Sequence, residues 1–151
     1  MDIVVNLSLK ILLAEDNVIN QKVASQMLKQ LGLKADLATN GLEVLDALRH
    51  QQYDVVLMDV QMPEMDGIEA TRQIRQEWNQ ENNPWIIAVT ANTIGGVREE
   101  CLSAGMNDFI SKPLKKDILM EALSKCPALT QTSATANEPP PIEPINDPQI
   151  I

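Results

Sequence analysis

The chain has 151 residues, of which 44% are hydrophobic and only 3% are aromatic, and its formal net charge is −9. This length accommodates one domain of ordinary size with a tail, and the composition predicts an aliphatic core. The negative net charge argues against the basic surface that nucleic-acid binding requires, so we expect no direct contact with nucleic acid. A negative net charge is compatible with a cation site.

The sequence carries no signal for secretion or membrane insertion. Asp2 stands where a signal peptide would have basic residues, and no apolar run approaches the roughly 18 residues of a membrane span. Cys101 and Cys126 are far apart and follow no metal-binding spacing. We therefore expect reduced thiols and a cytoplasmic location, without membrane insertion by this chain.

Short apolar runs alternate with helical patterns along the chain. After a leader of residues 1–8, strands are predicted at residues 10–14, 34–39, 55–58, 85–89 and 108–110, the second of them at a sheet edge. Helices between them are predicted from apolar residues at helical spacing: Ile19, Val23, Met27, Leu28 and Leu31; Val44, Leu45 and Leu48; Ile68, Ile74 and Trp78; residues 95–104; and Ile118, Leu119, Ala122 and Leu123. This alternation favours an α/β fold, with a parallel sheet covered by helices on both faces.

Residues that start and stop helices support these boundaries. Gly32 suits the end of the first helix. Gly95 and Gly96 open the fourth helix, and because a glycine inside a helix costs on the order of 1 kcal/mol relative to alanine, we expect that turn to be mobile. Capping residues precede the first three helices at Asn17, Asn40 and Asp66.

The composition changes at Pro127. The following stretch has no basic residue and contains Pro139, Pro140, Pro141, Pro144 and Pro148. Such a segment is typical of a linker or a disordered tail. The sequence therefore divides into a leader (1–8), one folded domain (9–126) and a tail (127–151).

Chemically useful side chains stand where the predicted strands stop. Glu15 and Asp16 follow the first strand, Asp59 ends the central apolar run, Thr90 ends the fourth strand and Lys112 follows the last. Because the carboxyl ends of parallel strands meet at one edge of a sheet, these side chains can lie together. A solvated loop position would explain any one of them alone, whereas five at successive strand ends favour a common site.

The chemistry of this set suits phosphoryl transfer. Three clustered carboxylates would repel and raise one another's pKa, and a hard cation with oxygen ligands, Mg²⁺, relieves that repulsion. Lys112 adds a positive charge and Thr90 a hydroxyl donor. The metal and the ammonium group would neutralise the transferring oxygens while the carboxylate of Asp59 attacks.

The same residues resemble the receiver domain of two-component response regulators. The resemblance covers roughly residues 9–125, with its motifs in order at residues 11–17, 56–67, 86–91 and Lys112-Pro113. Residues 15–21 and Ala104-Gly105-Met106 are most similar to receivers of hybrid sensor histidine kinases. The resemblance implies a flavodoxin-like, doubly wound sheet of five parallel strands in the order 2-1-3-4-5, an order that the sequence pattern alone does not specify.

The resemblance also assigns roles to single residues. It implies that Asp59 accepts a phosphoryl group from a histidine of a histidine kinase or a histidine phosphotransfer protein. It implies that Mg²⁺ is held by Asp59, the acidic pair Glu15 and Asp16, and the backbone carbonyl of Gln61. Glu15 departs from the Asp of many members, and one extra methylene permits metal contact through water.

Thr90 and Lys112 match the family residues that contact the phosphoryl oxygens, and the Lys112-Pro113 bond would be cis. Phe109 matches an aromatic residue whose rotamer follows the threonine. The resemblance thus implies a signalling switch that changes its interaction surface, with partner or dimer contacts on the fourth helix, fifth strand and fifth helix. It would not be an enzyme, beyond self-phosphotransfer and autodephosphorylation.

Three other interpretations fit the residues less well. A phosphatase of the haloacid-dehalogenase type would carry a second Asp where this chain has Gln61. A pseudo-receiver that only binds partners usually lacks the acidic pair, the Asp or the Lys, all of which are present. A flavodoxin-like cofactor binder needs a phosphate loop after the first strand, where Glu15 and Asp16 would repel a phosphate.

Overall fold

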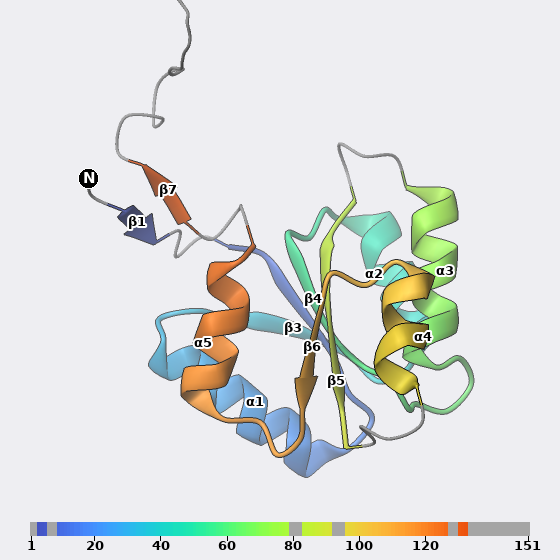
Figure 1. Cartoon of the computed structure of the whole chain (residues 1–151), viewed down its shortest axis with the longest axis horizontal. Helices are drawn as coiled ribbons and strands as arrows, with labels where there is room; N and C mark the ends of the chain where they lie inside the picture. The colour runs from blue at the N-terminus through green and yellow to red at the C-terminus, as the bar shows by residue number, and fades with distance from the viewer. Residues whose placement is uncertain (1–2, 6–8, 79–82, 92–95, 127–129, 133–151) are drawn as a thin grey trace, which may run out of the picture.

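The computed structural model describes residues 3–5, 9–78, 83–91, 96–126 and 130–132. Its main sheet contains five parallel strands in the order β3-β2-β4-β5-β6 (Figure 1). The bounds are β2 Ile11–Ala14, β3 Ala35–Ala38, β4 Val55–Asp59, β5 Trp85–Thr90 and β6 Asp108–Ser111. Counted within this sheet, the order is 2-1-3-4-5, as the resemblance implied.

Helices cover both faces of the sheet. Side chains from α1 (Val18–Gln30) and α5 (Lys116–Ser124) pack with one face, and those from α2 (Gly41–His50), α3 (Gly67–Glu77) and α4 (Val97–Ala104) pack with the other (Figure 1). The predicted doubly wound α/β fold is therefore confirmed. No helix among the described segments combines the length and the apolar character that a membrane crossing would need.

The central strand is buried on both of its faces. Val55 and Leu57 contribute to the core under α1 and α5, whereas Val56 and Met58 contribute to the core under α2, α3 and α4. Successive side chains of a strand point to opposite faces, so a strand covered on both sides reads as a continuous apolar run. This run places Asp59 at the edge of the sheet where the chemistry was predicted.

The first helix departs from the simple apolar-face interpretation. Ala24 and Leu28 are buried as expected of core positions, but Val18, Ile19 and Val23 are 59%, 70% and 45% exposed. The helical spacing correctly predicted a helix, because apolar residues three and four apart share one side of it. It could not tell which part of that side the sheet covers. Ile118 of α5 is likewise 41% exposed.

The predicted capping residues act as caps. The side-chain oxygens of Asn17, Asn40 and Asp66 accept hydrogen bonds from backbone N–H groups three residues ahead. Gly32 follows α1 with a φ of +83°, and Leu33 N–H donates to Leu28 O at 2.8 Å. That bond closes the helix in the left-handed turn that glycine adopts at least cost.

The fourth helix starts later than predicted. Gly96 precedes the helix as its N-cap, with a left-handed φ of +82°, and the helix runs from Val97. The predicted cost of a glycine inside a helix therefore does not apply to Gly96, because a left-handed cap is a position that glycine favours. Gly95 lies outside the described residues, and so does the prediction made for it.

A second, two-stranded sheet pairs a segment before the main sheet with a segment after α5. β1 (Ile3–Val5) pairs antiparallel with β7 (Thr130–Thr132), with Val4 opposite Gln131. The sequence pattern predicts no strand in the leader or in the tail, because three-residue strands are too short to show a periodic pattern. The Pro-rich residues 133–151 lie outside the described residues.

Candidate functional site

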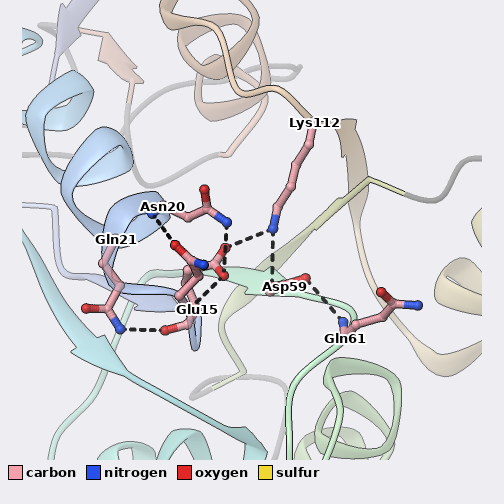
Figure 2. A network of polar contacts seen from close by, with 7 residues as sticks. Glu15, Asn20, Gln21, Asp59, Gln61 and Lys112 are labelled. Carbon is pink, nitrogen blue, oxygen red and sulfur yellow. Dashed lines mark hydrogen bonds and ion pairs between the residues drawn. The ribbon is translucent and has the colours of Figure 1, made fainter.

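The carboxyl edge of the sheet brings together side chains from distant parts of the chain. Glu15 follows β2, Asp59 ends β4, and Lys112 follows β6. The Lys112 ammonium nitrogen lies 3.0 Å from Glu15 Oε1 and 3.2 Å from Asp59 Oδ2 (Figure 2). The peptide bond between Lys112 and Pro113 is cis, as the resemblance implied.

Three carboxylates form a group that could hold a metal ion. One oxygen from each of Glu15, Asp16 and Asp59 lies within 4.8 Å of the others. Glu15 and Asp59 are buried, whereas Asp16 is exposed and opens the group to solvent. A set of hard oxygen ligands with a solvent-facing side fits Mg²⁺, which keeps several waters when it binds to proteins.

The first turn of α1 holds Glu15 in place. The side chain of Gln21 donates a hydrogen bond to the backbone carbonyl of Glu15 at 2.7 Å, and the N–H of Asn17 donates to Glu15 Oε2 at 3.2 Å. Asn20 Nδ2 lies 3.5 Å from the same carboxylate oxygen (Figure 2). The sequence pattern assigns Asn20 and Gln21 no role. They stand five and six residues after Glu15, in the first turn of α1, which lies next to the end of β2.

The buried charges shift one another's pKa. Burial and the neighbouring carboxylate of Glu15 raise the pKa of Asp59 to about 6, against the pull of Lys112. Burial opposes ionisation of Glu15 too, but its hydrogen bonds, above all the one from Lys112, hold its pKa below the ordinary value. Burial opposes the charge on Lys112, yet its hydrogen bond with Glu15 and the charge of Asp59 raise its pKa. The site thus has more negative charge than Lys112 alone can balance.

This imbalance predicts a pH-dependent stability in the absence of divalent metal. Because the folded pKa of Asp59, about 6, lies above its ordinary value of 3.8, its contribution to stability is present below about pH 4 and is lost as the pH rises through 6. At pH 8 without metal, Asp59→Asn should raise the free energy of unfolding by up to about 3 kcal/mol, since one pKa unit corresponds to about 1.4 kcal/mol. At pH 4 the two proteins should differ little.

Urea unfolding of both proteins at pH 4, 6 and 8 in a chelator measures this difference. Adding Mg²⁺ at pH 8 should reduce it, because the metal would bind and stabilise the protein with the carboxylate more than the variant. A gap between variant and wild type that is the same at all three pH values would contradict the assigned charge imbalance.

The loop after β4 lies close to the Asp59 carboxylate. Gln61 N–H donates to Asp59 Oδ1 at 3.2 Å (Figure 2), and Gly67 N–H donates to Val60 O at 2.9 Å. A Cβ on Gly67 would clash with the backbone oxygen of Asp59. Only glycine fits at this position, because the start of α3 approaches the end of β4 so closely.

Thr90 and Phe109 share one face of the sheet. Thr90 is 1% exposed at the end of β5, and Phe109, half-buried in β6, packs with the core under α2, α3 and α4. Phe109 pairs with Ala88, two residues before Thr90, so Thr90 and Phe109 are diagonal neighbours on adjacent strands. The relation between their rotamers remains a prediction.

A cavity of about 420 Å³ opens beside the polar cluster. Asn20, Asp59 and Lys112 line one part of it, and Val23 and Leu114 are among the residues of its apolar part. The cavity therefore extends from the Asp59 carboxylate to Val23, one of the exposed apolar residues of α1.

Residues 11–124 match the family model of the response regulator receiver domain. The chain belongs to this family. It is 46% identical over 126 residues to histidine protein kinase 1 of Candida albicans and 43% identical over 122 residues to hybrid signal transduction histidine kinase K of Dictyostelium discoideum. These matches cover 78% and 76% of this chain but only 5% and 10% of the two relatives.

Solved receiver domains have the same fold. The receiver domain of a sensor histidine kinase from Pseudomonas aeruginosa, solved with a magnesium ion coordinated in its active-site cleft, is 44% identical, with a TM-score of 0.71. That match covers 78% of this chain and 96% of the other. The Saccharomyces cerevisiae receiver domain of Ssk1, in complex with the histidine phosphotransfer protein Ypd1, is 28% identical with a TM-score of 0.71, covering 80% and 89%. The resemblance to receivers of hybrid histidine kinases, predicted from sequence, is confirmed.

Proposed function

We propose that this receiver domain is the phosphoacceptor of a two-component phosphorelay and that Asp59 takes the phosphoryl group. The observation that supports this most is the buried Asp59 carboxylate at 3.2 Å from the Lys112 ammonium, beside the second buried carboxylate, Glu15. A carboxylate with its cation already in place is held ready for an incoming group of high negative charge.

In the proposed reaction, an Asp59 oxygen attacks the phosphorus of a partner's phosphohistidine. A P–O bond forms as the P–N bond breaks, and the electron pair of the broken bond stays on the imidazole nitrogen. Lys112 would exchange its contact with Asp59 for one with a phosphoryl oxygen. The Thr90 hydroxyl would donate to another oxygen of the same group. Hydrolysis of the aspartyl phosphate by water would reset the domain without a further enzyme.

The residues that would hold Mg²⁺ are Glu15, Asp16, Asp59 and the backbone carbonyl of Gln61. When bound, the ion neutralises charge that develops on the transferring phosphoryl oxygens. The three carboxylate oxygens within 4.8 Å of one another support this choice, as does the magnesium ion in the related Pseudomonas receiver.

The proposed partner is a histidine kinase or a histidine phosphotransfer protein. The exposed Val18, Ile19 and Val23 on α1 offer it an apolar contact surface, and the cavity next to Asp59 is continuous with Val23. A contiguous exposed apolar patch is one of the features that mark a protein–protein contact. The complex of Ypd1 with the related Ssk1 receiver supports a partner of this class.

We expect phosphorylation of Asp59 to change the surface at the β6 edge of the sheet through Thr90 and Phe109. A charge-assisted hydrogen bond from Thr90 to the phosphoryl group is worth about 1.5–3 kcal/mol, so Thr90 would turn toward it. Phe109 would then fill the space, changing the surface formed by α4, β6 and α5, where partners or a second copy would bind. The shift can be no larger than the difference in interactions between the two states.

Beryllofluoride, which mimics the phosphoryl group, allows this switch to be observed by NMR. We expect shifts of the Thr90, Gly95, Gly96 and Phe109 signals that disappear in Asp59→Asn and shrink in Thr90→Ala. Shifts confined to residues 59–64, with Phe109 unmoved, would contradict the switch and leave phosphorylation unaffected.

The proposed division of the chain places the receiver at residues 9–126, between a leader and a Pro-rich tail, in the cytoplasm. Cys101 is buried and forms no disulfide, which supports a reducing compartment.

A transfer experiment tests the proposed function. Purified histidine phosphotransfer proteins, each charged with labelled phosphate on histidine, are mixed with the chain in Mg²⁺. We expect at least one donor to lose its label to this chain within minutes, and none to label Asp59→Asn. Retention of label by every donor, together with failure of acetyl phosphate to label the chain, would overturn the proposal.

A further inference from the structure

Within the described residues, the loop that follows Asp59 has one backbone hydrogen bond to a distant element, and its Met62 and Met65 side chains pack with the core. Among the described residues, the only backbone hydrogen bond that joins residues 61–65 to another element runs from Gly41 N–H, at the start of α2, to Met65 O at 2.8 Å. The base of the loop is closed separately, by the bond from Gly67 N–H to Val60 O. The bond from Gly41 therefore fixes the loop at its far end.

Within the loop the backbone is tightly bent. Met65 N–H donates to Pro63 O at 2.7 Å, and Glu64 between them has a φ of +69°. A non-glycine residue in this conformation costs free energy, so it persists only where the surroundings hold it. The hydrogen bond from Gly41 N–H to Met65 O is one such restraint, one residue away.

Gly41 permits this contact because it lacks a side chain. A Cβ at this position would lie 2.6 Å from Met65 Cγ and 2.7 Å from Met65 O. Gly41 does not have a positive φ, so the helix itself does not require glycine. Position 41 requires glycine because the loop approaches it closely.

The start of α2 is itself well anchored. Asn40 Oδ1 accepts from Glu43 N–H at 2.9 Å, and the Glu43 carboxylate accepts from Thr39 N–H at 2.7 Å and from the Thr39 hydroxyl at 2.9 Å. This reciprocal cap fixes the first turn of α2. A residue larger than glycine at position 41 would therefore displace the loop, the less firmly held side of the contact.

We infer that Gly41 is a positioning residue for the metal site. It holds the loop that carries Gln61, whose carbonyl is a proposed Mg²⁺ ligand and whose N–H donates to Asp59 Oδ1 at 3.2 Å. Gly41 would touch neither metal nor phosphoryl group and would act through Met65. This inference rests on the proposed function, because it concerns the affinity of the same site for Mg²⁺.

The expected effect is a loss of metal affinity. Changes to residues that orient metal ligands typically weaken binding by about 10–100-fold. For Gly41→Ala we expect Mg²⁺ affinity to fall about tenfold, measured by titrating Mg²⁺ alone and following the amide signals of Asp59 and Gln61. Coupling is reciprocal, so Mg²⁺ should also slow hydrogen exchange of the Gly41 amide in the wild-type protein.

Gly32→Ala is the matched control. Gly32 has a left-handed φ of +83°, so alanine there strains the chain and destabilises the fold. It follows the far end of α1, a helix of 13 residues that starts at the site and is about 20 Å long at 1.5 Å per residue. The Mg²⁺ affinity of Gly32→Ala should stay within twofold of the wild-type value. This result would separate loss of stability from loss of loop positioning.

Hydrogen exchange is measured on the wild-type protein with and without Mg²⁺, so this test of the inference does not depend on whether Gly41→Ala folds. The Gly41 amide should gain more protection from Mg²⁺ than the Gln51 amide, which donates to Ala47 O at the other end of α2. A folded Gly41→Ala with wild-type affinity, or equal gains at the two amides, would overturn the inference. Absence of saturable Mg²⁺ binding by the wild-type protein would overturn the metal part of the proposed function itself.

Discussion

Removal of Mg²⁺ by excess chelator is expected to slow phosphorylation of Asp59 by at least about a hundredfold. The pKa of Asp59 is raised to about 6 by burial and by Glu15 even before a phosphoryl group arrives. Without the metal, Lys112 is the only cation within the described residues that forms an ion pair with the two buried carboxylates. An incoming phosphoryl group would add further negative charge, and a metal typically supplies several kcal/mol of stabilisation for that charge.

The rate is measured with labelled acetyl phosphate, which avoids any effect of a partner's own metal. Asp16→Asn in saturating Mg²⁺ should reproduce much of the loss of phosphorylation rate, since Asp16 supplies one of the three oxygens of the carboxylate group. Asp46→Asn is the control, because Asp46 is an exposed residue of α2 whose carboxylate approaches His50 at 3.7 Å, away from the site. Unchanged labelling in chelator would rule out the metal assignment.

Lys112→Ala is expected to lower the phosphorylation rate by about 10²–10³-fold, the usual cost of removing one group that stabilises charge in a transition state. In the wild-type protein, the Lys112 ammonium nitrogen contacts Glu15 at 3.0 Å and Asp59 at 3.2 Å. The loss should appear in the maximal rate at saturating Mg²⁺ and donor, because the charge that Lys112 neutralises grows during transfer.

Lys125→Ala is the matched control for this charge change. Lys125 is exposed and lies 3.8 Å from Asp108 at the end of the sheet away from the site, so its loss should change the rate less than twofold. Lys112→Ala also leaves two buried carboxylates without their cation, so its fold must be verified by circular dichroism. A folded Lys112→Ala that is phosphorylated at the wild-type rate would contradict the proposed role.

The parts of the fold that rest on periodicity could be predicted. The apolar run at residues 55–58 predicted a strand buried on both faces, and Val55 to Met58 are all buried. The strand-end positions of Glu15, Asp59 and Lys112 predicted a common site because parallel strands end at one edge. The strand order came from the family resemblance, since no local pattern specifies which strands become neighbours.

Features that depend on tertiary approach could not be predicted. Spacing places Ile19 and Val23 on one side of a helix, but it does not show that the sheet leaves them exposed. The direct contact between Glu15 and Lys112 joins residues 97 positions apart, and the close approach of Gly41 to Met65 depends on how α2 meets the loop. Gly96 is a left-handed cap instead of a helical residue, a difference that composition alone does not reveal.

Mapping the phosphoryl group tests the central proposal most directly. The chain is phosphorylated in Mg²⁺, reduced with tritiated borohydride, which converts an aspartyl phosphate to labelled homoserine, and digested for peptide sequencing. We predict that homoserine replaces aspartate at position 59 alone and that Asp59→Asn incorporates no label. Homoserine at Asp16, Asp54 or Asp66 in the wild-type protein, with position 59 intact, would contradict the proposal.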